Sequence, residues 1–159
     1  MLQIEPDDPA REDVRLLLDE HLADMTATSP ADSMHALDHS ALADAGITFW
    51  TAREDGVLLG CGALKQLDPR QGEIKSMRTA PAARGRGVAA ALLGEIVSAA
   101  RHRGYEGLYL ETGSQDFFAP ARRLYERNGF IECAPFADYV LDPHSTFMHL
   151  DLAGGASAR

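Results

Sequence analysis

The hydrophobic residues of the first part of the chain recur mainly at helical spacing. A short alternating stretch at Leu2–Glu5 predicts a first strand. Apolar residues then recur every three to four positions over Arg11–Met25, and His21 falls on the same stripe, which predicts an amphipathic helix. A second, shorter helix is predicted over Met34–Ala43, and Gly46 follows it as the residue that ends it.

From Ile47 onward the spacing shortens to two, which is the period of a strand. Strands are predicted at Ile47–Arg53, Val57–Leu67 and Glu73–Ala80. The dipeptide Asp55-Gly56 predicts a tight hairpin turn between the first two, and Asp68–Gly72 predicts the turn before the third. The pattern therefore predicts three antiparallel strands in succession.

The second half of the chain alternates helices with short strands. A long helix is predicted over Arg86–Arg103, because it carries one continuous apolar stripe and meets Gly104 at its end. A second amphipathic helix is predicted over Phe117–Asn128. The strands of this half are predicted at Leu108–Glu111, Phe130–Cys133 and Thr146–Leu152.

These elements follow the order β-α-α-β-β-β-α-β-α-β-β, which predicts an α/β (α+β) fold with a mixed sheet and helices on both faces. The chain has 159 residues, of which 45% are hydrophobic, and this suits one domain with a substantial core. We place the domain at residues 1–152, because residues 153–159 are rich in Gly, Ala and Ser and predict a flexible tail.

The charge of the chain narrows the classes of partner. The formal net charge is -9, and no run of Lys or Arg occurs. A protein that holds nucleic acid through its phosphates carries a basic surface, so we expect no nucleic-acid partner. The acidic surface serves solubility first, and it also favours cationic substrates such as amines.

The cysteines and the N-terminus indicate the compartment. Cys61 and Cys133 lie far apart, in neither a disulfide framework nor a zinc-binding pattern. The first residues lack the basic and apolar regions of a signal peptide, and no apolar run approaches the roughly 20 residues that span a bilayer. We therefore expect a cytoplasmic protein with no membrane partner.

The candidate functional residues cluster where the strand that ends at Thr79-Ala80-Pro81 leads into the long helix. The first turn of a helix presents unpaired backbone N–H groups and the positive end of the helix dipole, which together bind anions such as a diphosphate. Gly85 and Gly87 remove Cβ atoms from this loop, and Arg84 and Arg86 add positive charge. The residues alone leave open a plain strand-to-helix turn with two solvated arginines.

Two motifs resemble the GNAT superfamily of N-acetyltransferases. Arg84-x-x-Gly87-x-Ala89 resembles the loop that holds the acetyl-CoA pyrophosphate in that family. Ala121-x-x-Leu124-Tyr125-x-x-x-Gly129-Phe130 resembles the family's A-x-x-L-Y-x-x-x-G-F helix. One helix and one strand separate the motifs, as in the family, and the resemblance covers Ile47–Phe130. It implies the GNAT fold, with a mostly antiparallel central sheet of about seven strands.

Within the superfamily, the chain is similar to a bacterial small-molecule group that includes the YsnE-like proteins. The segments that carry this similarity are His35–Asp38, Gly60–Leu64, Glu73–Arg78, Leu110–Ser114 and Pro135–Tyr139. The resemblance implies an enzyme that moves the acetyl group of acetyl-CoA to the primary amine of a small molecule, by direct attack in a ternary complex. The acceptor stays unidentified.

The resemblance also implies which residues hold acetyl-CoA. They are Met77, Arg78, Thr79, Arg84, Gly85, Arg86, Gly87, Val88 and Ala89. In the family the strand that carries the first three splays away from its neighbour, and the cofactor lies in the cleft. The family often has Asn seven residues before its tyrosine; that position is Phe118 here, and Ser114 or Gln115 is the substitute contact.

Tyr125 matches the tyrosine that protonates the leaving thiolate in the family. Its phenol can donate a hydrogen bond to sulfur. The alternative is an aromatic residue that only packs beneath the sheet.

The general base has three candidates. Glu73 matches the base of the histone-acetylating branch of the family, and a period of two places Glu73, Lys75, Met77 and Thr79 on one face of their strand. Glu73 could equally be a solvated carboxylate. Glu111 ends the neighbouring strand, beside the expected splay, and is the rival base. A water chain without a dedicated base is the third alternative.

The acceptor side is expected near His35, Asp38 and Lys75, because the two N-terminal helices flank the acceptor cleft in the family. His35 and His39 have the i, i+4 spacing of metal ligands, but no third ligand lies nearby in the sequence, and we expect no metal.

Further alternatives stay open at this stage. One is a longer acyl-CoA donor, and another is an acyl-CoA-binding sensor without catalysis. A homodimer is also open, because edge strands near the C-terminus commonly pair in this fold.

Overall fold

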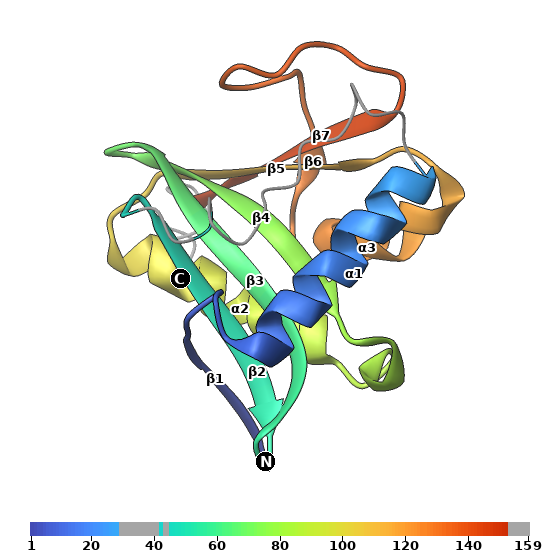
Figure 1. The fold of residues 1–159 in the computed structure, drawn as a ribbon. Coiled ribbons are helices and arrows are strands. Elements are labelled where there is room, and N and C mark those ends of the chain that lie inside the picture. The colour runs from blue at the N-terminus through green and yellow to red at the C-terminus, as the bar shows by residue number, and fades with distance from the viewer. Residues whose placement is uncertain (29–41, 43–44, 153–159) are drawn as a thin grey trace.

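A seven-stranded sheet organises the protein, as the computed structural model in Figure 1 shows. The structure describes residues 1–28, 42 and 45–152. The strands are β1 (Leu2–Pro6), β2 (Ile47–Glu54), β3 (Val57–Asp68), β4 (Gln71–Thr79), β5 (Gly107–Gly113), β6 (Ile131–Glu132) and β7 (Ser145–Asp151). Their spatial order is β1-β2-β3-β4-β5-β7-β6, and β4 and β5 run parallel while the other neighbouring pairs run antiparallel. The predicted mixed, mostly antiparallel sheet is confirmed.

Short two-residue turns connect β2 to β3 and β3 to β4. Asp55 and Gly56 have φ of 53° and 81°, the pair of positive values that a type I′ hairpin requires. The predicted turn over Asp68–Gly72 is shorter than expected, because β3 reaches Asp68 and β4 begins at Gln71. The Asp68 carboxylate accepts a hydrogen bond from the Arg70 backbone N–H at 2.8 Å, which closes the turn locally.

Helices cover both faces of the sheet, as predicted. In Figure 1, α1 (Glu12–Thr28) crosses one face over β3 and β4, and α2 (Val88–His102) lies against the other. α3 (Ala119–Arg127) follows the 3₁₀ turn η4 (Asp116–Phe118), and a further 3₁₀ turn, η3 (Pro81–Ala83), follows β4. The helix predicted over Met34–Ala43 lies outside the described residues except for Leu42, which is buried.

The core has two parts that match the two helical layers. Under α2, the fully buried residues Leu92, Leu93 and Ile96 pack against the sheet, and each contributes roughly 1.5–3 kcal/mol of hydrophobic free energy. Under α1, Val14 and Leu18 pack on the opposite face. No helix within the described ranges is both long and apolar enough to cross a bilayer.

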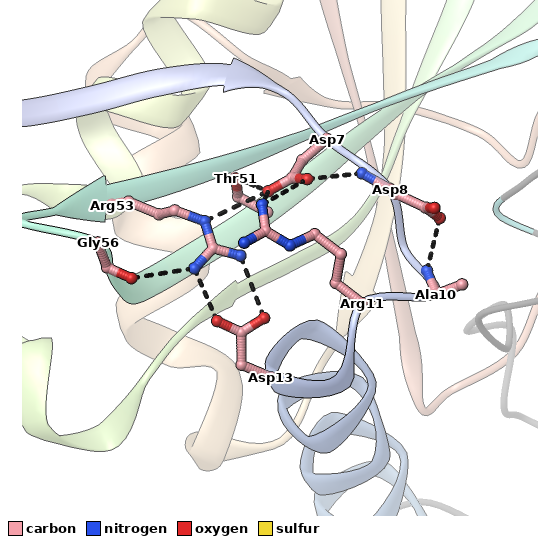
Figure 2. Close-up of polar contacts among 8 residues, drawn as sticks. All are labelled: Asp7, Asp8, Ala10, Arg11, Asp13, Thr51, Arg53 and Gly56. Carbon is pink, nitrogen blue, oxygen red and sulfur yellow. Dashed lines mark hydrogen bonds and ion pairs between the residues drawn. The ribbon is translucent and has the colours of Figure 1, made fainter.

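Where β1, α1 and β2 meet, charged and polar side chains form the N-terminal polar network of Asp7, Arg11, Asp13, Thr51 and Arg53 (Figure 2). Thr51 Oγ1 donates to Asp7 Oδ2 at 2.6 Å. Arg53 donates to both carboxylate oxygens of Asp13, at 2.7 and 3.1 Å, and Arg11 and Arg53 also contact Asp7. The network fixes the start of α1 to the sheet.

Candidate active site

The strands β4 and β5 begin side by side and then separate. They pair only from Gln71 with Gly107 to Ile74 with Leu110. Beyond that point β4 stays with β3, and β5 stays with β7 as far as Gly113. Among the described residues, the far half of β4 therefore has an edge without a strand partner, and the expected splay is confirmed.

A β-bulge in β4 lies at the start of this splay. Between the pairs Cys61–Arg78 and Ala63–Lys75, β4 has one residue more than β3. Ser76 lies inside the bulge with φ of 57°, in the left-handed region. The Cys61 thiol donates to the Ser76 carbonyl at 3.4 Å, which fixes the bulged backbone to β3.

The bulge changes which residues of β4 share a face. Lys75 and Arg78 face α1: Lys75 lines a cavity together with residues of α1, and Arg78 forms ion pairs with that helix. Met77 packs into the core beneath α2, on the opposite face. The prediction that Glu73, Lys75, Met77 and Thr79 lie on one face is wrong, because the inserted residue breaks the period of two.

A cavity of about 560 Å³ lies at the open end of the splay, a size typical of small-molecule sites. Its lining includes these predicted residues: Met77, Arg78, Thr79, Arg84, Gly85, Gly87, Val88, Ala89 and Tyr125. The structure thus brings the end of β4, the loop before α2 and the candidate acid on α3 to one site. Arg86 and Ser114 do not line this cavity.

The loop before α2 owes its shape to two glycines. Gly85 and Gly87 have φ of 80° and 79°, and a Cβ atom on either would meet no atom of the described residues within 4 Å. Their backbone conformation therefore requires glycine, whereas space does not. Gly87 is the N-cap of α2 without a side-chain cap, and the first intrahelical bond runs from Ala91 N to Gly87 O. The N–H groups of Val88, Ala89 and Ala90 precede that bond, so they have no intrahelical acceptor.

The two arginines of this loop are not equivalent. Arg84 lines the large cavity. Arg86 donates from Nη2 to Glu54 Oε1 on β2 at 2.6 Å, and its side chain is half exposed. Part of its charge is therefore already balanced by a carboxylate.

The position of the family's usual Asn is filled by an apolar ring. Phe118 is buried and lines the large cavity. Ser114, the predicted substitute, donates its hydroxyl to the Pro143 carbonyl at 2.5 Å. That hydrogen bond directs the hydroxyl of Ser114 to the segment before β7.

Tyr125 is buried on α3 and lines the large cavity. Its ring meets the edge of Phe130 with centroids 5.7 Å apart, so it also packs in the core. Burial raises the pKa of the Tyr125 phenol, and the negative charge of Glu111 raises it further. The phenol is therefore protonated at neutral pH and can act as a hydrogen-bond donor.

A smaller cavity of about 50 Å³ lies on the α1 side of β4. Its lining residues are His21, Met25, Glu73, Ile74, Lys75, Ser76 and Glu111. His21 also lines the large cavity, so the two cavities meet at this side chain. Both candidate bases therefore lie beside the site that contains Tyr125.

Glu73 is part of a buried hydrogen-bonded triad. Its side chain is only 3% exposed, so it is not the solvated carboxylate that the sequence left open. Lys75 Nζ lies 3.1 Å from Glu73 Oε2, and Tyr139 OH donates to the same oxygen at 2.6 Å. Lys75 Nζ also donates to Tyr139 OH at 2.8 Å. We call these three residues the Glu73 triad.

Glu111 and His21 have unusual ionisation for a protein interior. Burial raises the pKa of Glu111 to about 7, and the charge of Glu73 contributes. Burial lowers the pKa of His21 to about 4, and the positive charge of Arg78 contributes. Near pH 7, Glu111 is therefore partly ionised and the imidazole is neutral.

Arg78 fixes α1 to the splayed strand. Its guanidinium contacts Glu20 at 2.5 Å and Asp24 at 2.7 Å, and its side chain is 7% exposed. The sequence pattern did not predict this role of Arg78 or the position of His21 at both cavities. The available signal was a histidine on the apolar stripe of the first helix.

Two predicted residues cannot be placed. His35 and Asp38 lie outside the described residues. Within the part of the chain that is described, no group of three or more His, Cys, Asp or Glu residues could hold a metal ion.

The chain is similar in sequence to known acetyltransferases. The acetyltransferase (GNAT) family matches residues 14–130. The chain is 52% identical to the uncharacterized N-acetyltransferase YsnE of Bacillus subtilis, over 92% of this chain and 97% of YsnE. It is 46% identical to the uncharacterized N-acetyltransferase YedL of Escherichia coli, over 96% of each chain.

A solved structure shares the fold. The yncA protein of Salmonella typhimurium, solved with its cofactor acetyl-CoA, superposes with a TM-score of 0.70 at 22% identity, over 95% of this chain and 94% of that one. With the splay, the glycine loop and the family match in agreement, the chain belongs to the GNAT family of acetyltransferases.

Proposed function

We propose that the protein transfers the acetyl group of acetyl-CoA to the primary amine of a small molecule, by direct attack in a ternary complex. The observation that carries this proposal is the large cavity, which joins the start of α2 to Tyr125 along the free edge of β4. The acetyl-CoA bound to the Salmonella yncA protein supports the choice of donor.

The residues of the large cavity suit acetyl-CoA. The free N–H groups at the start of α2 and the Arg84 guanidinium suit the diphosphate, which is an anion. Within the described part of the chain, the backbone edge of Met77–Thr79 has no strand partner toward β5, and this edge suits the amide groups of the pantetheine arm. In this placement the thioester lies toward Tyr125 and the splay.

We assign the role of general base to Glu111. A base is most effective when its pKa lies near the working pH, and the pKa of Glu111 is about 7. Glu111 lines the small cavity, and its negative charge raises the pKa of Tyr125. Glu73 has one carboxylate oxygen engaged by Lys75 and Tyr139, and we assign the triad to the wall of the acceptor site.

In the proposed reaction the acceptor nitrogen loses two protons and the leaving sulfur gains one. The ammonium group of the acceptor gives one proton to the Glu111 carboxylate and becomes a free amine. Its nitrogen attacks the thioester carbon, the N–C bond forms, and the C–S bond breaks. Tyr125 gives its phenol proton to the leaving sulfur and regains one from the acetylated nitrogen. Glu111 then releases its proton to solvent, so the products are an amide, CoA thiol and one proton.

The first test is a calorimetric titration of the protein with acetyl-CoA and desulfo-CoA, followed by thiol-release assays on a panel of amino acids, polyamines and ethylamine. Binding of acetyl-CoA together with turnover of at least one amine supports the proposal. Binding without turnover of any amine points instead to a non-catalytic acyl-CoA sensor. Faster turnover with a longer acyl-CoA points to a different donor, and no binding of any acyl-CoA rejects the site.

A further inference from the structure

The proposed base and the proposed acid line different cavities. Glu111 lines the small cavity, whereas Tyr125 lines the large cavity, toward which the thioester is proposed to lie. A proton that leaves the acceptor nitrogen beside the thioester therefore crosses from the large cavity to the small one before it reaches Glu111. Proton transfer needs groups within hydrogen-bond reach of each other, either directly or through one intermediate. A residue that contacts both cavities can supply that intermediate.

His21 on α1 is such a residue. Among the residues that the structure describes, it is the one that lines both cavities. His21 follows the buried Leu17 by four positions and precedes the buried Met25 by four, so all three lie on the face of α1 that packs on the sheet. The helix therefore directs the imidazole toward β4 and the splay.

Both ring nitrogens of His21 are available for hydrogen bonds. Neither forms a hydrogen bond with another described residue. The fully buried side-chain atoms without a partner in these ranges include Ser76 Oγ and Arg78 Nε, but no nitrogen of His21. The ring nitrogens therefore keep access to the cavities that His21 lines.

The surroundings of His21 keep the ring neutral. Burial and the charge of Arg78 lower its pKa to about 4, and the opposing effect of Asp24 is smaller. A neutral imidazole has one N–H group and one bare nitrogen, so it can accept a proton at one side while it donates a proton at the other. This transfer forms no imidazolium ion, which burial disfavours. The ionisable residues that line the small cavity with His21 are Glu73, Lys75 and Glu111.

We propose that His21 relays a proton from the acceptor amine to Glu111. The bare ring nitrogen takes a proton from the ammonium group, the opposite N–H gives its proton to the Glu111 carboxylate, and the imidazole stays neutral in its other tautomer. Glu111 then releases its proton to solvent. The ring restores its first tautomer by losing one proton to water and gaining one from water, so the net result is one proton passed from amine to solvent. The inference rests on the proposed function, because it adds a catalytic residue to the same reaction.

The first test replaces the imidazole by side chains that cannot relay a proton. His21→Gln keeps a hydrogen-bonding group, but a carboxamide does not accept a proton at neutral pH, and His21→Ala removes the ring. With ethylamine, or the fastest amine of the panel, kcat should fall about 50-fold in both variants. The acetyl-CoA dissociation constant should stay within about twofold of the wild-type value, because the diphosphate is held at the start of α2. Added imidazole should raise kcat of His21→Ala about tenfold and leave the wild type unchanged.

His149 on β7 supplies the matched control. It is partly buried, its ring lies 4.6 Å from the Tyr109 ring between centroids, and it lines neither of the two cavities. His149→Gln should keep the wild-type kcat, and added imidazole should not change it.

A double variant separates a relay from a merely structural role. A relay and its base act as one unit, so the losses from removing each of them do not multiply. His21→Gln combined with Glu111→Gln should therefore be about as slow as the slower single variant. Independent roles would multiply two losses of roughly 50-fold into one of roughly 2,500-fold.

The outcomes separate the relay from the reaction itself. If the wild type turns over an amine and both His21 variants keep kcat within about threefold, the relay is wrong and the proposed function stands. If the two losses multiply in the double variant, or if imidazole restores nothing to His21→Ala, His21 acts through the fold and the relay is also wrong. If the wild type releases no thiol with any amine, the proposed function fails and the relay fails with it.

Discussion

Buried carboxylates in the N-terminal polar network and at the β4–β5 splay have pKa values shifted in opposite directions. In the network, burial raises the pKa of Asp7, but the hydrogen bond from Thr51 and the contacts with Arg11 outweigh it, so the pKa is lowered. The hydrogen bonds from Arg53 lower the pKa of Asp13. Each charged side chain of the network therefore forms an ion pair with a group of opposite charge.

At the splay the same burial is only partly compensated, because the lowering effects of Ser145 and Lys75 on the pKa of Glu111 are smaller than the effect of burial. Burial raises the pKa of Glu111 to about 7, and Ser76 Oγ and Arg78 Nε have no hydrogen-bond partner in the described part of the chain. Buried polar groups are normally paired, so the unpaired groups of Ser76, at the small cavity, and Arg78, at the large cavity, indicate a functional region. The paired side chains of the network stabilise the fold, whereas we propose that the buried side chains at the splay bind substrate. Each of the following variants tests this difference.

The largest effect is expected for Tyr125→Phe. It removes the proton that the leaving thiolate needs but keeps the ring contact with Phe130. We expect turnover to fall by about 100-fold or more, a typical effect of losing a general acid. The calorimetric dissociation constant of acetyl-CoA should be unchanged. Tyr109→Phe is the control, because its ring packs on Phe136 and His149 outside the cavities, and it should keep full turnover.

For Glu111→Gln we expect kcat/KM at neutral pH to fall by roughly 50-fold, as for loss of a general base. Wild-type activity should rise with pH through about 7, as Glu111 loses its proton, and the variant should lack this limb of the profile.

The stability of the same variant gives an independent check. The folded pKa of Glu111 is raised above that of the unfolded chain. Its stabilising contribution is therefore fully present below the unfolded pKa of about 4.3 and is lost as pH rises through about 7. Because Gln stays neutral, the variant should melt higher than the wild type at pH 8. A lower melting point there would assign Glu111 to the fold instead.

An intermediate effect is expected for Arg84→Ala, which should weaken acetyl-CoA binding about tenfold, the loss of one charge-assisted hydrogen bond. Arg86→Ala should weaken binding less, by roughly threefold, because Arg86 is engaged by Glu54. Calorimetry on both variants at one salt concentration measures the difference. Equal losses would mean that Arg86 leaves Glu54 when the cofactor binds.

The smallest effect is expected for Asp7→Asn in the N-terminal polar network. It should lower the free energy of unfolding at neutral pH by about 1 kcal/mol, which is a fivefold change in the folding equilibrium. The kinetic constants should not change. Because the folded pKa of Asp7 is lowered, its stabilising contribution is present above the unfolded pKa of about 3.9 and is lost as pH falls further. The difference between variant and wild type should therefore shrink in acid unfolding experiments.

Local patterns predicted the elements of the fold well. The apolar stripe with Leu92 and Ile96 gave the long helix, and the Asp55-Gly56 dipeptide gave the hairpin. The start of that helix was placed two residues early, at Arg86, because the spacing of apolar residues does not show that Gly87 takes a left-handed backbone. Element ends depend on single backbone angles, and periodicity averages over them.

Some residues of the candidate site could likewise be predicted from local patterns, and others could not. Tyr125 and the loop around Arg84 were predictable, because short motifs specify them and the elements beside them carry strong signals. The faces of β4 were not, because one inserted residue at Ser76 reverses every position beyond it. Tyr139 reaches Glu73 across 66 positions of sequence, a separation at which no periodicity carries information.

The sequence by itself determined the family, the order of the described elements and the glycine loop that lines the large cavity, because these depend on neighbours within one helix, strand or turn. Only the tertiary structure decided which carboxylate has its pKa raised by burial and which one is hydrogen-bonded by neighbouring side chains. Lys75 and Tyr139 converge on Glu73, whereas at Glu111 burial outweighs the lowering effects of Ser145 and Lys75 on its pKa.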